Sequence, residues 1–381
     1  MCAALSRRGT LPLKGGSVSI KLNRRQFTLG CGAAVTVAGL WNRTRLWAAT
    51  PESTIKPRRI IIDTDPGVDD AFALMLALGS PELKVEAITA VAGNVPLELT
   101  LPNALRLREI CGRNDVPVAG GAASPLVRKL VTANYAHGEN GLGGVEFPAP
   151  VTKPVEEKAA DLIVRLVRQH PGEITLVPIG PLTNIALALR TAPELAEMVP
   201  QIVLMGGSLS GGNETPSAEF NFYVDPEAAA MVFDSGIPIM MVGLDVTEKV
   251  VLTEERLRRL EANAKRVSRA AARIARSLVE TYRKKGYRDW PVLHDPLAVS
   301  ALLDPAILTF EDYHVEIETA GTFTAGESVG FKPEHSRRSA PIQNAGLEPP
   351  VEKVRPNCKV AKTVDAPRFF DLLISRLEYG G

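Results

Sequence analysis

The sequence lacks a charge imbalance that would point to a polyanionic partner. Its 381 residues carry a formal net charge of +1, with 44 basic and 43 acidic side chains. A chain this close to neutral has no general electrostatic attraction to nucleic acid or to an anionic membrane surface. We therefore expect no nucleic-acid partner, and a small neutral or mixed-charge molecule is the favoured ligand.

The sequence also lacks internal repeats, and beyond residue 50 it lacks any apolar run long enough to span a bilayer. Hydrophobic residues nevertheless make up 45% of the chain. That proportion supplies enough apolar material for one large core or two modest ones. We predict a globular domain over residues 51–381, with no stable membrane span.

The first 50 residues differ in character from the rest. Arg24 and Arg25 precede a short, Gly- and Ala-rich apolar stretch, and small residues follow Trp47. This layout is typical of a twin-arginine export signal, with cleavage near residues 48–50 and a periplasmic or other extracytoplasmic destination. A membrane anchor is the alternative, but residues 26–41 are short for a span and contain three glycines.

Cysteine is scarce, with four in the whole chain. Cys2 and Cys31 would leave with the export signal, whereas Cys111 and Cys358 would remain. Two interpretations of the remaining pair stay open: a disulfide in an oxidising compartment, or two buried thiols that pack as small hydrophobes. Their spacing matches no metal site, so we assign them no chemistry.

What the chain does have, from residue 58 onward, is a regular alternation of apolar runs and amphipathic stretches. Runs that are apolar throughout and separated by helices predict a parallel sheet covered on both faces. We therefore expect a single α/β domain with an open, mainly parallel, Rossmann-like sheet. Residues 326–357 are rich in Pro and charge and are expected to form a loop or excursion with no obvious chemistry. The expected strands lie at 58–64, 84–93, 173–180, 201–207 and 237–245.

Four aspartates are crowded where the first expected strand meets the next helix. Asp63 and Asp65 end the strand, and Asp69 and Asp70 enter the helix after a tight Pro-Gly turn. Crowded carboxylates are tolerated when a cation or a helix N-terminus faces them. Because every donor is an oxygen, Ca²⁺ or Mg²⁺ is the expected cation. Capping of the helix explains one aspartate, but not four.

Polar groups also follow the other expected strands. Ligands of doubly wound sheets bind outside the carboxyl ends of the strands, so these groups are expected to converge there. They are Asn94, the main-chain carbonyl of Ile179, Asn213, Glu219, Asn221, His294 and Asp295.

Five motifs, in this order, resemble the inosine-uridine-preferring nucleoside hydrolases. The resemblance is strong over about residues 58–300 and implies a Ca²⁺-dependent N-ribohydrolase with a Rossmann-like fold. Such enzymes release the free base and ribose through an activated water, and they are commonly dimers or tetramers. The motifs are "DTDPGVDDAFAL", "HGENGLG", "LVPIGPLTNIA", "GNETPSAEFNFYVDPEAA" and "HDPLAV".

The resemblance implies a role for each matching position. Asp65 corresponds to the general base and His294 to the acid that protonates the leaving base. Asp63 is expected behind the site, where it supports the residues that face the ligand. The implied metal ligands are Asp65, Asp70, the Ile179 carbonyl and Asp295, and the implied substrate contacts are Asp69, Asn94, His137, Asn213, Glu219, Phe220 and Asn221.

Elementary chemistry agrees with these roles. Cleavage of an N-ribosidic bond passes through an oxocarbenium-like sugar, which neighbouring carboxylates stabilise. A histidine is suited to protonating a base nitrogen near neutral pH. Alternatives stay open for both histidines: His294 would merely orient Asp295, and His137 would merely order its loop. The aromatic that covers the base is expected among Tyr282, Tyr287 and Trp290.

Two other functions fit part of the pattern. An exported nucleoside-binding protein would keep the pocket and lose turnover, but the retained carboxylates argue against it. A haloacid-dehalogenase-like phosphotransferase also ends a strand with Asp-x-Asp and binds Mg²⁺. Pro66 and the loop that carries Asn213, Glu219 and Asn221 argue against that class.

Overall fold

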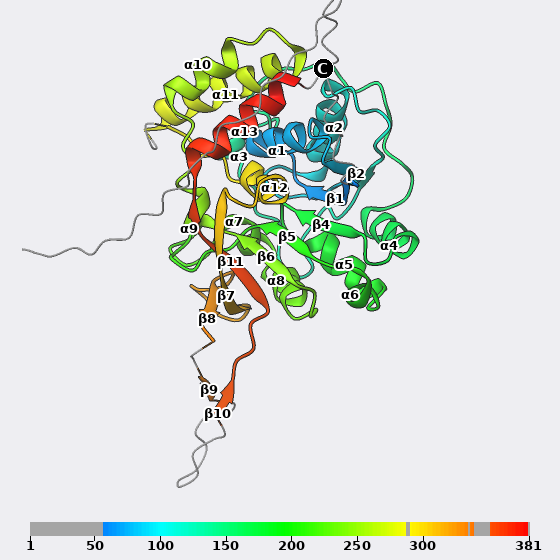
Figure 1. Cartoon of the computed structure of the whole chain (residues 1–381), viewed down its shortest axis with the longest axis vertical. Helices are drawn as coiled ribbons and strands as arrows, with labels where there is room; N and C mark the ends of the chain where they lie inside the picture. Colours follow the sequence, from blue (N-terminus) through cyan, green and yellow to red (C-terminus); the bar gives the residue numbers. More distant parts are fainter. Residues whose placement is uncertain (1–55, 287–289, 334–335, 339–350, 380–381) are drawn as a thin grey trace, which may run out of the picture. The chain divides into compact units, whose positions relative to one another are not determined.

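The structure is a computed structural model that describes residues 56–286, 290–333, 336–338 and 351–379 (Figure 1). The predicted export signal over residues 1–50 lies outside the described residues, as does Tyr287. Within the described part, the expected α/β architecture is confirmed.

A nine-stranded sheet forms the centre of the domain, in the order β3-β2-β1-β4-β5-β6-β11-β7-β8. The first seven strands in this order pair in parallel, and β7 and β8 add an antiparallel edge. The strands of the sheet are β1 (Arg58–Thr64), β2 (Leu83–Ala90), β3 (Val118–Gly120), β4 (Ile174–Pro178), β5 (Ile202–Met205), β6 (Ile239–Val242), β7 (Leu308–Ile317), β8 (Ser328–Phe331) and β11 (Cys358–Val364).

The strand order reverses between β1 and β4. Chain order runs outward from β1 through β2 to β3 on one side, and from β4 through β5 to β6 on the other. The connections that leave β1 and β4 therefore diverge to opposite sides, which opens a crevice at the carboxyl ends of these two strands. Asp63 pairs with Pro178 in the ladder between β1 and β4, so Asp65 lies two residues beyond this pair and Ile179 one residue beyond it, at the same edge of the sheet.

Helices cover both faces of the sheet, as expected (Figure 1). Within β1, Ile60 and Ile62 pack into one apolar core and Ile61 into the other, as period-2 alternation requires. The first core is formed with α1 (Val68–Leu78), α2 (Leu97–Ile110), α9 (Leu244–Thr247), α10 (Glu254–Glu261), α11 (Arg266–Lys285), α12 (Asp295–Leu303) and α13 (Ala366–Tyr379). The second is formed with α4 (Ala159–Gln169), α5 (Thr183–Thr191), α6 (Leu195–Met198), α7 (Phe220–Val224) and α8 (Pro226–Phe233).

The segment 326–357 differs from the expected loop. It contains β8, which pairs with β7, and a separate two-stranded ladder of β9 (Ser336–Arg338) and β10 (Val351–Lys353). These pairings were not predicted because antiparallel strands can be short and need only a reversal of the chain between them. The polar and Pro-rich sequence around them shows no strand pattern. Further along, α13 packs back on the core through buried Phe369, Phe370 and Leu373, as predicted.

The thiols of Cys111 and Cys358 are both free. Burial raises the pKa of each thiol to about 12, which keeps both protonated and unreactive. Of the two interpretations of this pair, packing as small hydrophobes describes the structure.

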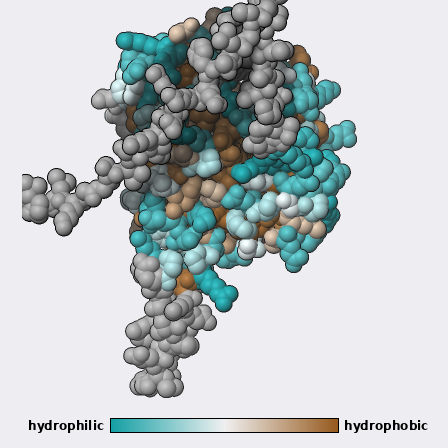
Figure 2. All heavy atoms as spheres, viewed as in Figure 1, coloured by the Kyte–Doolittle hydropathy of each residue, from teal (hydrophilic) through white to brown (hydrophobic). Residues whose placement is uncertain are grey.

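Hydrophilic side chains dominate the face shown in Figure 2, with apolar ones gathered toward its centre. Strongly exposed large hydrophobic side chains in the described residues include Val127, Val151 and Phe323, which lie far apart in the sequence. No helix in the described part of the chain is both long and apolar enough to cross a membrane.

Candidate functional site

Asp65 lies at the reversal point of the sheet, directly after β1. Its Oδ2 accepts the main-chain N–H of Asn94 at 2.6 Å. A Cβ added to Gly93 or Gly180 would approach the Asp65 carboxylate to within 2.1 or 2.3 Å, so only glycine lets the chains after β2 and β4 come this close. Asp65 Oδ1 is buried and has no hydrogen-bond partner among the described residues. A buried carboxylate oxygen without a partner is costly unless a cation faces it.

Asp70 occupies the first turn of α1 and joins the helix to Asp65. Its Oδ2 accepts the N–H of Gly67 at 2.9 Å, so Asp70 caps the helix. Helix capping was the role expected for one of the four aspartates. The same oxygen accepts Asn94 Nδ2 at 3.0 Å, and Oδ1 accepts the N–H of Asp65 at 3.2 Å. One side chain therefore caps the helix and also orders the turn that presents Asp65.

Asp69, Asp70 and Asp295 form a buried cluster of carboxylates. Each offers an oxygen, and these oxygens lie within 4.8 Å of one another. Asp295 comes from the start of α12, more than 200 residues from the other two. Burial, and then the negative charges of Asp69 and Asp70, raise the pKa of Asp295 well above its usual range. Carboxylates held this close without a countercharge repel one another, and a hard divalent cation satisfies them.

The predicted metal-ligand set matches this cluster in part. Asp70 and Asp295 belong to it, whereas Asp69 completes it in place of Asp65. Asp65 is close enough that the charge of Asp70 adds to burial in raising the Asp65 pKa. The Ile179 carbonyl accepts Asn221 Nδ2 at 3.1 Å, so it is engaged rather than free, although a carbonyl keeps a second lone pair.

A cavity of about 410 Å³ opens over these carboxylates. All seven predicted substrate contacts line it, as do His294, Asp295 and Ile179. Asp63, Asp65 and Asp70 are fully buried beneath its wall. Side chains that lie as much as 226 positions apart in the sequence therefore surround one space of the size that binds a small molecule.

Glu219 organises the loop that follows β5. As the N-cap of α7, its carboxylate accepts the N–H groups of Asn221 and Phe222. Oε2 of Glu219 also accepts the N–H of Gly207 at 2.9 Å. Burial raises the pKa of Glu219 to about 7 despite these three donors. Asn213 Oδ1 accepts the N–H of Phe220 at 2.9 Å, which closes the loop over the cavity wall.

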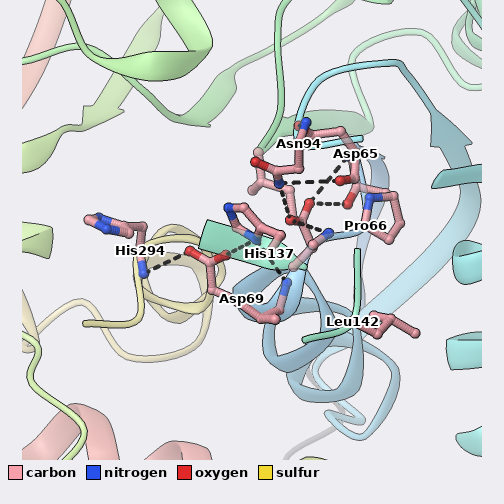
Figure 3. Close-up of polar contacts among 12 residues, drawn as sticks. Asp65, Pro66, Asp69, Asn94, His137, Leu142 and His294 are labelled. Atoms are coloured by element: carbon pink, nitrogen blue, oxygen red, sulfur yellow. Dashed lines mark hydrogen bonds and ion pairs between the residues drawn. The ribbon is translucent and has the colours of Figure 1, made fainter. Parts of the chain in front are cut away.

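Two histidines line the cavity on either side of Asp69 (Figure 3). His137, at the end of α3 (Asn134–His137), accepts the N–H of Val68 through Nδ1 at 3.1 Å. A main-chain N–H only donates, so Nδ1 of His137 carries no proton and Nε2 does. The N–H of His294 donates to Asp69 Oδ2 at 3.3 Å, and its ring Nδ1 lies 2.8 Å from the hydroxyl oxygen of Thr247.

Asp63 lies behind the cavity wall, where the sequence placed a supporting residue. Its Oδ1 accepts the Thr89 hydroxyl and, at 2.8 Å, Asn184 Nδ2. Burial raises the pKa of Asp63 to about 7. These contacts connect the end of β1 to β2 and α5, so Asp63 braces the strand that carries Asp65.

Several residues of the cavity wall escaped the sequence-based prediction. Tyr282 was a candidate for covering the base and does line the cavity, whereas Trp290 packs under the Arg283 guanidinium, 4.6 Å from its ring centre. Leu278 precedes Tyr282 by four residues on α11, so helical periodicity offered a signal that both share a face. Tyr135 and Glu248 also line the cavity, and no pattern in the sequence marked them.

Comparison with known proteins is consistent across sequence and structure. The family model of inosine-uridine preferring nucleoside hydrolases matches residues 60–371. A pyrimidine-specific ribonucleoside hydrolase, RihA, from Salmonella gallinarum is 43% identical over 322 residues, which cover 84% of this chain and 98% of that protein. Two solved structures superpose on 84% of this chain. They are a plant nucleoside hydrolase, PpNRh1 (36% identity, TM-score 0.77, 99% of that chain), and a purine-preferring ribonucleoside hydrolase from Gardnerella vaginalis (32% identity, TM-score 0.75, 98% of that chain).

Proposed function

The chain belongs to the inosine-uridine preferring nucleoside hydrolase family and is a ribonucleoside hydrolase, and on that premise we propose how its cavity performs the reaction. The observation that carries the proposal is the group of buried carboxylates at the reversal point of the sheet, with an unpartnered Asp65 oxygen beneath a small-molecule cavity. Carboxylates in this position stabilise the positive charge that develops on the ribose ring.

The resident cation in this proposal is Ca²⁺. The residues fit such an ion because their donors are all oxygens, they are buried, and burial with mutual repulsion raises the pKa values of Asp65, Asp70 and Asp295. Asp65, Asp69, Asp70, Asp295 and the Ile179 carbonyl are the groups available to hold it. When bound, the cation supplies countercharge to the carboxylates and Lewis acidity to oxygen ligands.

Asp65 acts as the general base in this mechanism. It takes a proton from the attacking water as the water oxygen forms a bond to C1′ of the ribose. The C1′–N bond breaks, and its electron pair moves to the nucleobase, which receives a proton from His294. Water is consumed, and ribose and the free base are released. Attack on the face opposite the leaving base predicts inversion at C1′.

The remaining polar residues orient the ribose. Asp69 and Asn221 are assigned to the 2′- and 3′-hydroxyls, and Asn213 with Glu219 to the 5′-hydroxyl. Their own hydrogen bonds to the backbone support this role, because side chains held in place lose little entropy on binding. Asn94, which bridges Asp65 and Asp70, is assigned to the attacking water.

We further propose that pyrimidine nucleosides are the preferred substrates. The 43% identical protein from Salmonella gallinarum is named pyrimidine-specific, whereas the purine-preferring structural neighbour is 32% identical. Identity over nearly the whole domain supports the first as the better guide to the base preference.

A substrate panel tests the function. Ribose release from uridine, cytidine, inosine and adenosine is measured as reducing sugar, with and without a calcium-selective chelator. We expect turnover of uridine and cytidine above the purine nucleosides, and loss of turnover with the chelator that added Ca²⁺ reverses. Turnover that persists unchanged in the chelator would overturn the cation assignment, and equal rates on all four would overturn the base preference.

We propose, separately, that residues 1–50 direct export through the twin-arginine pathway, on the basis of Arg24, Arg25 and the apolar stretch that follows. Fusion of residues 1–50 to a reporter that is active only after export tests this. We expect export by the native segment and its loss in the Arg24→Lys/Arg25→Lys double variant. Equal export by both would contradict the proposal.

A further inference from the structure

Thr247 is a buried residue that the mechanism above does not use. It is the last residue of α9, which follows β6, and its exposed fraction is 0%. Its hydroxyl oxygen lies 2.8 Å from Nδ1 of His294, which is 47 residues later in the chain and is the N-cap residue of α12. A buried hydroxyl needs a hydrogen-bond partner, and this contact supplies one across two separate elements.

The contact restrains how the His294 ring can turn. The main chain of His294 is held by its N–H bond to Asp69 Oδ2 at 3.3 Å, but that bond leaves the side-chain torsions unrestrained. The Thr247 hydroxyl adds a point of attachment on the ring itself. A hydroxyl accepts from an N–H as readily as it donates to a bare ring nitrogen, so it holds the ring in either tautomer.

We propose that Thr247 is the positioning residue for His294. By engaging Nδ1, it directs the opposite ring nitrogen, Nε2, to the base in the cavity that His294 lines. The inference rests on the proposed role of His294 as the proton donor. It adds a residue from α9 to the reaction, since no sequence motif named Thr247 and it does not itself line the cavity.

Loss of a positioning residue is expected to lower kcat and to leave substrate binding nearly unchanged. A ring that loses its attachment at Nδ1 spends less time in the productive orientation, so Thr247→Val should lower kcat on uridine and leave KM within about twofold. General acid catalysis contributes roughly 10²–10⁴-fold, so partial loss of orientation is expected to cost about tenfold or more. Thr247→Ser keeps the hydroxyl and should recover most of the rate.

The substrate 4-nitrophenyl riboside separates orientation from general damage. Its phenolate leaves without protonation, so a variant with an intact site but a misdirected acid should cleave it at the wild-type rate. The control variant is Thr175→Val, the same substitution at a buried threonine of β4 outside the cavity wall. We expect wild-type rates from that control on both substrates.

A Thr247→Val enzyme with wild-type kcat on uridine would overturn the proposal. So would equal loss of activity on uridine and 4-nitrophenyl riboside in both Thr247→Val and Thr247→Ser. His294→Ala separates this from failure of the mechanism. If His294→Ala retains uridine hydrolysis, the proton-donor role itself is wrong. If His294→Ala loses uridine hydrolysis and Thr247→Val does not, only the positioning role is wrong. In the His294→Ala background, Thr247→Val should have no further effect on kcat.

Discussion

The cavity has two walls of different construction. The carboxylate wall comprises Asp69 and Asp295, which line the cavity, together with Asp65 and Asp70, which are buried beneath them. These four carboxylates are at most 5% exposed and are joined to strand ends and helix N-termini by hydrogen bonds. The helical wall, which comprises Tyr135, Leu278 and Tyr282, stands on α3 and α11, and Tyr135 is 45% exposed. The first wall is built at the end of β1, where Asp65 follows the strand and Asp69 and Asp70 enter α1, with Asp295 added from the start of α12. The second wall depends on how α3 and α11 pack over it.

From this difference we expect the first wall to serve the chemistry and the second to set the selectivity for the base. A strand end cannot shift without disrupting its ladder, so groups placed there keep the geometry that catalysis needs. A side chain on a covering helix can change without altering the sheet. We therefore expect substitutions in the carboxylate wall to abolish turnover, and substitutions in the helical wall to change which base is accepted.

Replacement of Asp65, the proposed general base, tests the carboxylate wall most severely. Asp65→Asn preserves shape but removes the proton acceptor and one negative charge, so kcat on uridine should fall about 10³-fold or more. Uridine binding should change far less, which equilibrium binding measures separately. A kcat within tenfold of wild type would mean that another group takes the proton.

Cation affinity tests whether the carboxylate wall works as one unit. Burial and mutual repulsion raise the pKa values of Asp65, Asp70 and Asp295, so protons compete with a cation for these oxygens more strongly than they do at exposed carboxylates. Ca²⁺ affinity, measured by calorimetry, should therefore be lower at pH 6 than at pH 8.

The matched comparison uses two carboxylates in different settings. Asp70→Asn should weaken Ca²⁺ binding at both pH values, whereas Asp304→Asn should not, because Asp304 pairs with Arg368 at a surface site that lowers its pKa. Calcium affinity that is independent of pH, or equal effects of the two substitutions, would contradict a shared cation site.

A substitution in the helical wall is expected to change the selectivity between pyrimidine and purine nucleosides. Tyr282→Ala removes an aromatic side chain from the cavity, and base stacking on an aromatic ring contributes about 1–3 kcal/mol. We expect KM for uridine to rise about tenfold and the ratio of pyrimidine to purine turnover to change, with kcat on 4-nitrophenyl riboside nearly unchanged. Trp290→Ala, which alters the neighbouring segment, should leave the base ratio unchanged if it remains folded.

The smallest effect on turnover concerns Asp63, the brace behind the carboxylate wall, where the expected change is in stability. Asp63 has its folded-state pKa raised to about 7, so it stabilises the metal-free protein below about pH 4, and that contribution is lost as pH rises through 7. Asp63→Asn stays neutral and keeps the oxygen that accepts Asn184. In chelator, the variant should therefore be more stable than wild type at pH 8 by on the order of 4 kcal/mol. The difference should shrink as the pH falls from 7, and below about pH 4 the two should be nearly equal, as chemical denaturation would measure. A variant that is less stable at pH 8 would mean that the charge of Asp63 supports the fold.

The fold followed from the sequence because apolar runs of strand length alternate with amphipathic helices. The strands around Ile60 and Val203 are apolar on both faces, which only a sheet covered by helices accommodates. The antiparallel β8 was not predicted, because a four-residue strand with an exposed Val329 shows no clear periodicity.

The sequence by itself determined the chemistry of this protein: oxygen donors at successive strand ends, and a topology that brings those ends together. Local order along the chain is enough for that, because parallel strands align their carboxyl ends. Only the tertiary structure decided which carboxylates cluster, that Asn221 engages the Ile179 carbonyl, and that Thr247 holds His294. These contacts join residues that are distant in sequence. Their distances are set by the packing of whole helices against the sheet, which no local pattern records.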